Sequence, residues 1–144
     1  MEALWNEPVA KALSIIDSDP PFMGCVAVFD IDDTVLISST DNIITPVKTL
    51  YLKLLNLGIE IHFITARPPC VRLYTENQLK ILGFSGYTKL HMITWTNLVN
   101  KGMRKFYKRR DIEEEGKVIW MNVGDDETDF WGGLFIHAVG PINV

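Results

Sequence analysis

Short apolar runs alternate along this chain with longer segments in which apolar residues recur every three or four positions. A short apolar run is typical of a strand buried on both faces, and the wider spacing is typical of a helix packed on one side. The predicted strands cover residues 25–29, 59–64, 90–93, 118–123 and 134–139. The predicted helices cover residues 4–16, 46–57, 71–82 and 103–115. This alternation predicts an α/β fold, a parallel sheet of about five strands with helices on both faces.

Prolines and length set the expected boundaries. A proline pair separates the first helix from the first strand, so we expect residues 1–21 to form an N-terminal helical extension and residues 22–144 the core. Asp41 or Thr45 would cap the second helix, with Pro46 at its first position. A length of 144 residues fits a single domain.

Composition narrows the classes of protein that the chain can represent. The net charge of −4 argues against a general attraction to nucleic acid. Cys25 and Cys70 have no zinc or disulfide spacing, and we expect two buried free thiols. No apolar run approaches the roughly 20 residues of a membrane span, and the first residues lack the features of a signal peptide. We therefore expect a cytoplasmic protein without membrane contact.

Three polar clusters directly follow predicted strands, at residues 30–34, 65–67 and 124–129. Ligands of parallel sheets bind beyond the carboxyl ends of the strands, so we expect these clusters to converge. Two like charges 4 Å apart repel by about 4 kcal/mol at an effective dielectric of 20, so gathered acids need a cation. Carboxylate oxygens suit Mg²⁺. The acids concerned are Asp30, Asp32, Asp125, Asp126 and Asp129.

These clusters resemble the motifs of the haloacid dehalogenase (HAD) superfamily of phosphatases. Residues 30–34 (DIDDT) match its D-x-D-x-T signature, residues 61–65 (IHFIT) its second motif, and residues 124–129 (GDDETD) its fourth, G-D-x-x-x-D. Within the superfamily, residues 65–68 (TARP) and the spacing from Lys105 to the fourth motif most resemble acid phosphatases related to plant vegetative storage proteins. The resemblance implies a Rossmann-like sheet with strand order 5-4-1-2-3.

The resemblance also implies the reaction and its residues. Asp30 would attack phosphorus and form an aspartyl-phosphate, and Asp32 would be the general acid and base. Thr65 and the Ala66 N–H would bind the phosphoryl oxygens, and Lys105 would neutralise developing charge. The function implied is hydrolysis of a phosphomonoester with Mg²⁺ as cofactor.

The same family pattern implies a metal site. Asp30, Asp125 and the backbone carbonyl of Asp32 would hold Mg²⁺, with Asp129 as a support and Asp126 as a substitute ligand. Lys101 and Lys108 lie close enough in sequence to compete with Lys105 for the role of the motif lysine, although the spacing favours Lys105.

Two basic features have alternative interpretations. Arg67 could clamp a substrate phosphate or carboxylate, or form a surface ion pair. The basic stretch 101–110 could line a nucleic-acid groove. The favoured interpretation is a helix in which Arg109 and Arg110 pair with Glu113 and Glu114.

The chain leaves little room for a substrate-selecting cap. Residues 36–43 allow only a short flap, and residues 93–103 allow no inserted domain. A capless site would accept a bulky phosphorylated substrate, or a second copy of the chain would cover it in a homo-oligomer.

Three other functions compete with a small-molecule phosphatase. The chain could be a non-catalytic storage-type or phosphate-binding relative, although it retains Asp30, Asp32 and Thr65. It could be a receiver-type phospho-switch, but no acid follows its third predicted strand, where a receiver carries the phosphorylated aspartate. Within the enzymes, it could be a polynucleotide end phosphatase, for which binding would weaken steeply with salt.

Overall fold

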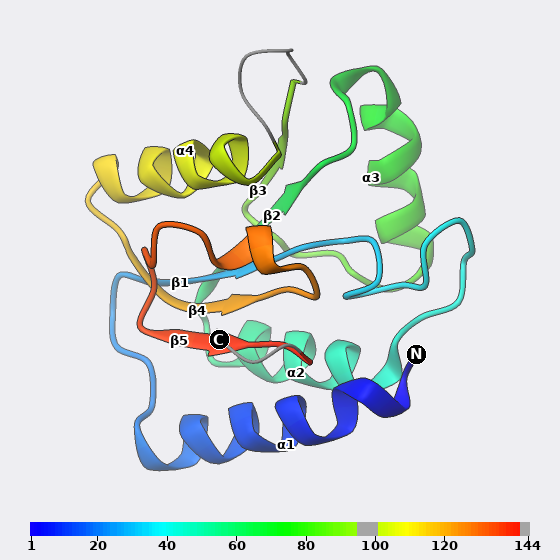
Figure 1. Cartoon of the computed structure of the whole chain (residues 1–144). Coiled ribbons are helices and arrows are strands. Elements are labelled where there is room, and N and C mark those ends of the chain that lie inside the picture. Colours follow the sequence, from blue (N-terminus) through cyan, green and yellow to red (C-terminus); the bar gives the residue numbers. More distant parts are fainter. Residues whose placement is uncertain (95–100, 142–144) are drawn as a thin grey trace.

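One parallel sheet organises the part of the chain that the structure describes. The computed structural model describes residues 1–94 and 101–141 (Figure 1). The strands are β1 (Cys25–Phe29), β2 (Glu60–Thr65), β3 (Lys89–Met92), β4 (Val118–Val123) and β5 (His137–Val139). They pair in parallel in the order β3-β2-β1-β4-β5, which is the expected order 5-4-1-2-3 read from the other edge. The predicted fold class and strand order are confirmed.

Helices cover both faces of this sheet. The helices are α1 (Ala3–Ser18), α2 (Thr45–Asn56), α3 (Arg72–Ile81) and α4 (Lys101–Glu114), with 3₁₀ turns η1 (Pro69–Val71) and η2 (Glu127–Phe130). Figure 1 shows α1 and α2 on one face and α4 on the other. The main core lies on the α1/α2 side, where Phe29, Tyr51 and Phe63 pack ring against ring. No helix among the described residues is long and apolar enough to span a membrane.

Some element boundaries differ from the predicted ones. The helix expected from residue 71 starts at Arg72, because Pro69 begins a 3₁₀ turn in front of it. The last strand begins at residue 137 rather than 134, because Phe135 N–H donates to the Gly133 carbonyl in a turn. Helix α4 already includes residues 101 and 102.

The predicted cap of α2 is wrong. Ile44 stands at the N-cap and makes no side-chain capping bond, so neither Asp41 nor Thr45 caps this helix. Instead, Glu2 from the start of α1 accepts a 2.7 Å hydrogen bond from the Thr45 N–H. A carboxylate at a helix N-terminus satisfies an unpaired donor and complements the helix dipole. Tertiary contact replaces the expected local cap.

The two cysteines also differ from each other. Cys25 is buried at the start of β1, as predicted, whereas Cys70 is exposed in η1 and the expectation of a second buried thiol is wrong. The turn η1 begins at Pro69, and none of its three residues is buried.

Helix α1 helps to shape the loop after β1. Trp5 is fully buried, and its indole Nε1–H donates to the Asp33 carbonyl at 3.2 Å. Asp33 itself adopts a left-handed conformation (φ 60°) and accepts a 2.9 Å hydrogen bond from the Ser38 N–H. The turn that follows Asp30 is therefore held from outside the loop as well as from within.

The segment between β1 and α2 forms only a short flap. The bond from Ile37 N–H to the Asn42 carbonyl (2.9 Å) closes it, and the bond from Ile44 N–H to the Val35 carbonyl (2.9 Å) ties it to α2. This agrees with the expected absence of a cap here. The second place where a cap was weighed, residues 93–103, lies largely outside the described residues.

A pair of histidines is buried between β2 and β3. His62 Nδ1 and His91 Nε2 lie 2.9 Å apart, and the two rings are stacked. Burial lowers the pKa of both, that of His91 to about 3. Both histidines are thus packed inside the fold.

Acid should weaken the fold through this pair. An unfolded histidine binds a proton near pH 6.5, whereas folded His91 resists protonation down to about pH 3. Between those values the unfolded state holds more protons, so stability falls by about 1 kcal/mol per pH unit as pH decreases. Urea unfolding of the wild type and His91→Gln between pH 7 and 5 measures this. The same slope in both proteins would contradict the assignment.

Candidate active site

The three polar clusters meet at one edge of the sheet. Asp30 directly follows β1, Thr65 ends β2, and Asp125 lies two residues beyond β4. Strand β1 pairs with both β2 and β4, so the carboxyl ends of these strands lie side by side. The Asp30 N–H donates to the Val123 carbonyl at 3.0 Å and continues the ladder to the edge. The predicted convergence is confirmed.

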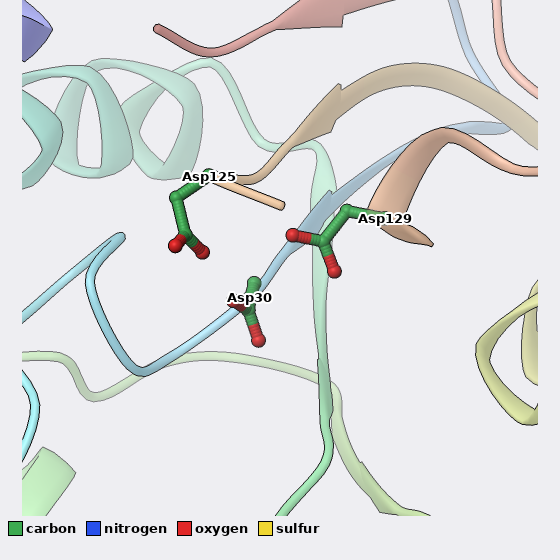
Figure 2. A group of neighbouring side chains, drawn as sticks. All are labelled: Asp30, Asp125 and Asp129. Atoms are coloured by element: carbon green, nitrogen blue, oxygen red, sulfur yellow. The ribbon is translucent and has the colours of Figure 1, made fainter. Parts of the chain in front are cut away.

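Three carboxylates gather at this edge. One oxygen from each of Asp30, Asp125 and Asp129 lies within 4.8 Å of the others, and Figure 2 shows the three side chains around a common space. Asp30 and Asp129 are buried, and Asp125 is partly exposed. Burial, reinforced by neighbouring carboxylates, raises the pKa of Asp30 and that of Asp129 to about 6. Burial therefore disfavours the ionised form of both carboxyl groups.

Lys105 reaches this cluster from α4. Its side chain is buried, and Nζ donates to Asp30 Oδ1 at 3.0 Å and to Asp129 Oδ1 at 2.5 Å. Burial alone would lower the pKa of Lys105, but the two adjacent carboxylates raise it on balance. Among the three candidate lysines, Lys105 is the one in contact with Asp30, while Lys101 pairs with Asp126 at 3.0 Å.

The buried stripe of α4 explains how a lysine enters the site. Gly102, Lys105, Arg109 and Ile112 are the buried positions of this helix and recur at helical spacing. Gly102 is required here, because a Cβ at this position would collide with the Trp131 ring. The close approach of α4 to the η2 region brings the Lys105 ammonium to the strand ends.

The predicted surface role of Arg109 is wrong. Arg109 is only 1 % exposed and donates from Nη2 to the Trp131 carbonyl. Burial lowers its pKa to about 10, against the opposing effect of Asp129. The signal was present in the sequence, because Arg109 lies four residues after Lys105 on the same buried stripe. The predicted pairing of Arg109 with Glu113 rested only on the charges along the helix and left out its buried stripe.

Asp126 and Asp129 have different environments. Asp126 caps η2 by accepting from the Thr128 N–H at 2.9 Å, which lowers its pKa to about 2. Asp129 Oδ2 accepts from the Asp126 N–H at 3.1 Å, and its Oδ1 is held by Lys105. Asp126 therefore lies outside the carboxylate cluster, because its side chain turns back to η2, and its role as a substitute ligand stays a prediction.

Asp32 and Arg67 form a bidentate ion pair. Arg67 Nε and Nη2 lie 3.0 and 2.8 Å from the two oxygens of Asp32, and this pairing raises the pKa of Arg67. Arg67 Nη1 also donates to Thr75 and Gln78 on α3. Arg67 is thus paired with Asp32 inside the fold rather than in a surface ion pair, and its role as a clamp for substrate stays a prediction. The Asp32 carboxylate is held by Arg67 and does not belong to the group of Asp30, Asp125 and Asp129.

Thr65 closes the other side of the site. It is buried at the end of β2, and its hydroxyl accepts a 3.1 Å hydrogen bond from the Arg67 N–H. Ala66 follows it directly, at the edge where β2 lies beside β1. On the β4 side, the Thr34 hydroxyl donates to Asp125 Oδ1 at 3.2 Å and orients this carboxylate.

The donor set fits a hard divalent cation. Three carboxylates face one ammonium, so the described cluster keeps an excess of buried negative charge. Asp30 and Asp125 each keep an oxygen that Lys105 does not occupy, whereas both oxygens of Asp129 are engaged. Asp30 and Asp125 would therefore hold the ion, and Asp129 would position Lys105.

Comparison with known proteins agrees with this geometry. The profile of the HAD superfamily, subfamily IIIB (acid phosphatase), matches residues 38–139. Because this match covers well over half of the chain, the protein belongs to that family. The match begins after the DIDDT motif of residues 30–34. This motif therefore supports the family assignment independently of the match. A comparison with curated protein sequences gave no match.

Two solved structures share the fold. The class C acid phosphatase from Bacillus anthracis with tungstate bound is 20% identical, with a TM-score of 0.69 over 92% of this chain. A second structure of the class C acid phosphatase from that organism is 21% identical, with a TM-score of 0.68 over 92% of this chain. In both cases the chain spans only 65% of the length of that phosphatase.

Removal of the buried ammonium should destabilise the protein strongly. Lys105→Met leaves Asp30 and Asp129 without their partner, which typically costs about 3–5 kcal/mol. Lys101→Met is the matched control, because its partner Asp126 is partly exposed and such pairs contribute about 1 kcal/mol or less. Urea unfolding with and without Mg²⁺ measures both, and Mg²⁺ should restore part of the loss. Equal small losses in the two variants would refute the central place of Lys105.

The effect of Mg²⁺ on stability should distinguish the roles of Asp125 and Asp126, the two acids that follow β4. Mg²⁺ at 100 times its dissociation constant should stabilise the wild type by about 2.7 kcal/mol. Asp125→Asn should abolish this gain, and Asp126→Asn should preserve it, because Asp126 faces η2. Thermal unfolding across a Mg²⁺ titration measures the effect, with calorimetric titration as a second readout. Loss of the gain in Asp126→Asn alone would reverse the assignment.

Proposed function

We propose that this protein is a Mg²⁺-dependent phosphomonoester hydrolase that works through an aspartyl-phosphate on Asp30. One observation carries the proposal: Asp30 directly follows the central strand β1, with one oxygen held by buried Lys105 and with Asp125 beside it. Family membership supports phosphate-ester hydrolysis as the reaction class. The substrate is accordingly a phosphorylated molecule.

In the first step, the substrate phosphoryl group binds at the end of β2. The Thr65 hydroxyl and the Ala66 N–H donate to its oxygens, while Lys105 balances the charge of Asp30. An Asp30 oxygen attacks phosphorus, the bond to the leaving oxygen breaks, and Asp32 gives that oxygen a proton. Arg67 fixes the orientation of Asp32 through two parallel hydrogen bonds.

In the second step, Asp32 accepts a proton from a water molecule, which attacks the phosphorus of the aspartyl-phosphate. The bond between phosphorus and Asp30 breaks, and inorganic phosphate leaves. A cation held by Asp30 and Asp125 would reduce the repulsion between the nucleophile and the phosphate. The Lys105 ammonium balances further negative charge at Asp30, and the Ala66 N–H holds a phosphoryl oxygen.

Substitutions within one loop test the proposed roles. With a generic aryl phosphate and Mg²⁺, Asp30→Asn should abolish turnover, because the amide is a poor nucleophile. Asp32→Asn should lower kcat by about 10²–10⁴, the usual contribution of positioned acid–base catalysis.

Asp33→Asn is the matched control for this loop. An asparagine tolerates the left-handed backbone, and its carbonyl can still accept from the Ser38 N–H, so activity should persist. Undiminished activity in Asp30→Asn would refute the nucleophile assignment. Absence of turnover in the wild type over a broad panel of esters, despite Mg²⁺ binding, would favour a non-catalytic relative.

A further inference from the structure

A cleft opens directly beside Asp32, and none of the three clustered carboxylates lines it. Its volume is about 400 Å³, within the range of small-molecule sites. It lies between the flap and α3, which Figure 1 shows next to each other at one end of the molecule. Its lining includes Asp32 and Arg67, Asp41 of the flap, and Tyr74 and Gln78 of α3. A group that receives a proton from Asp32 would therefore lie at the mouth of this cleft.

The cleft continues into an apolar groove along α3. Asp41, Tyr74 and Gln78 line both, and the groove of about 300 Å³ adds Ile81 and Leu82 to the surface. Tyr74 is 63% exposed and Ile81 is 81% exposed. These two side chains therefore present apolar surface directly beside the polar cleft.

The walls of the cleft are already joined. Gln78 Nε2 donates to Asp41 Oδ1 at 2.8 Å, and Gln78 Oε1 accepts from Arg67 at 2.8 Å. One side chain thus connects the flap, α3 and the residue that orients Asp32. A preformed site loses less entropy on binding than one that must be assembled.

The charge of the cleft disfavours a second anion. Among the described residues that line the cleft and the groove, Arg67 is the sole cation, and Asp32 already neutralises it. Asp41 adds a further carboxylate. A leaving group with its own phosphate would face two carboxylates and no free cation, at a cost in affinity.

We propose that this cleft binds the leaving group of the substrate and selects a phosphomonoester whose leaving group is uncharged and apolar, either aryl or alkyl. The inference rests on the proposed function and extends it to substrate choice. The Tyr74 ring and Ile81 contact the apolar body of the leaving group, while its oxygen lies at Asp32. The same arrangement discriminates against polynucleotide ends, where a second phosphate follows the first.

Esters of matched reactivity test this selection. The wild type should hydrolyse n-hexyl phosphate with about tenfold higher kcat/KM than ethyl phosphate, because only the longer chain reaches the groove. 2-Phenylethyl phosphate against n-hexyl phosphate, both esters of primary alcohols, distinguishes an aromatic from an alkyl leaving-group body. Hexane-1,6-diol bisphosphate should be poorer than n-hexyl phosphate by about tenfold, since it places a second anion in the groove.

Variants on α3 connect the selection to the groove. Tyr74→Ala should raise KM for the hexyl ester more than for ethyl phosphate and so remove most of the preference, while Tyr74→Phe should retain it. Leu73→Ala is the matched control, because Leu73 is equally open to solvent on the same helix but does not line the groove. Equal loss for both esters in Tyr74→Ala, or preference for the bisphosphate, would overturn the proposal.

A binding experiment distinguishes failure of the leaving-group site from failure of the proposed catalytic function. If no ester is turned over, calorimetric titration with n-hexylphosphonate and ethylphosphonate in the presence of Mg²⁺ still tests the cleft. Tighter binding of the hexyl compound that depends on Tyr74 would support the leaving-group site without catalysis. Equal binding of the two phosphonates would overturn it.

Discussion

The site depends on one buried ammonium group. Lys105 Nζ lies between Asp30 and Asp129, and without it these two buried carboxylates, with Asp125 beside them, would lose the cation that hydrogen-bonds to both. Burial already raises the pKa of Asp30 and Asp129 to about 6, so their ionised forms depend on nearby positive charge. Helix α4 must therefore approach the strand ends closely, and Gly102 allows that approach by leaving room for the Trp131 ring.

This constraint divides the acids into groups with different tasks. Asp30 and Asp125 face the space in which a divalent ion would fit, Asp129 positions Lys105, and Asp126 caps the turn that presents Asp129. Asp32 stands apart in its pair with Arg67, at the entrance of the cleft along α3. The proposed chemistry places the nucleophile on the buried side and the acid–base residue where the leaving group would lie.

Much of this arrangement could be predicted from the sequence, and the exceptions have physical reasons. Apolar runs identified the strands, because a central parallel strand is buried on both faces. The convergence of Asp30, Thr65 and Asp125 followed once their strands were taken as neighbours. The burial of Arg109 was missed because local charge pairing was considered before the stripe it shares with Lys105. The Asp32–Arg67 pair joins loops 35 residues apart, and its geometry depends on the folded flap.

The measurement that tests the account most directly is the location of phosphate on the quenched enzyme. The Asp32→Asn variant, in which loss of the base slows the second step, is mixed with an aryl phosphate and Mg²⁺, denatured rapidly in acid and mapped by mass spectrometry. The account predicts phosphate on the peptide that contains Asp30, and none when Asp30→Asn is added to the same protein. Phosphate on another residue, or turnover in the wild type with no covalent adduct in any variant, would contradict it.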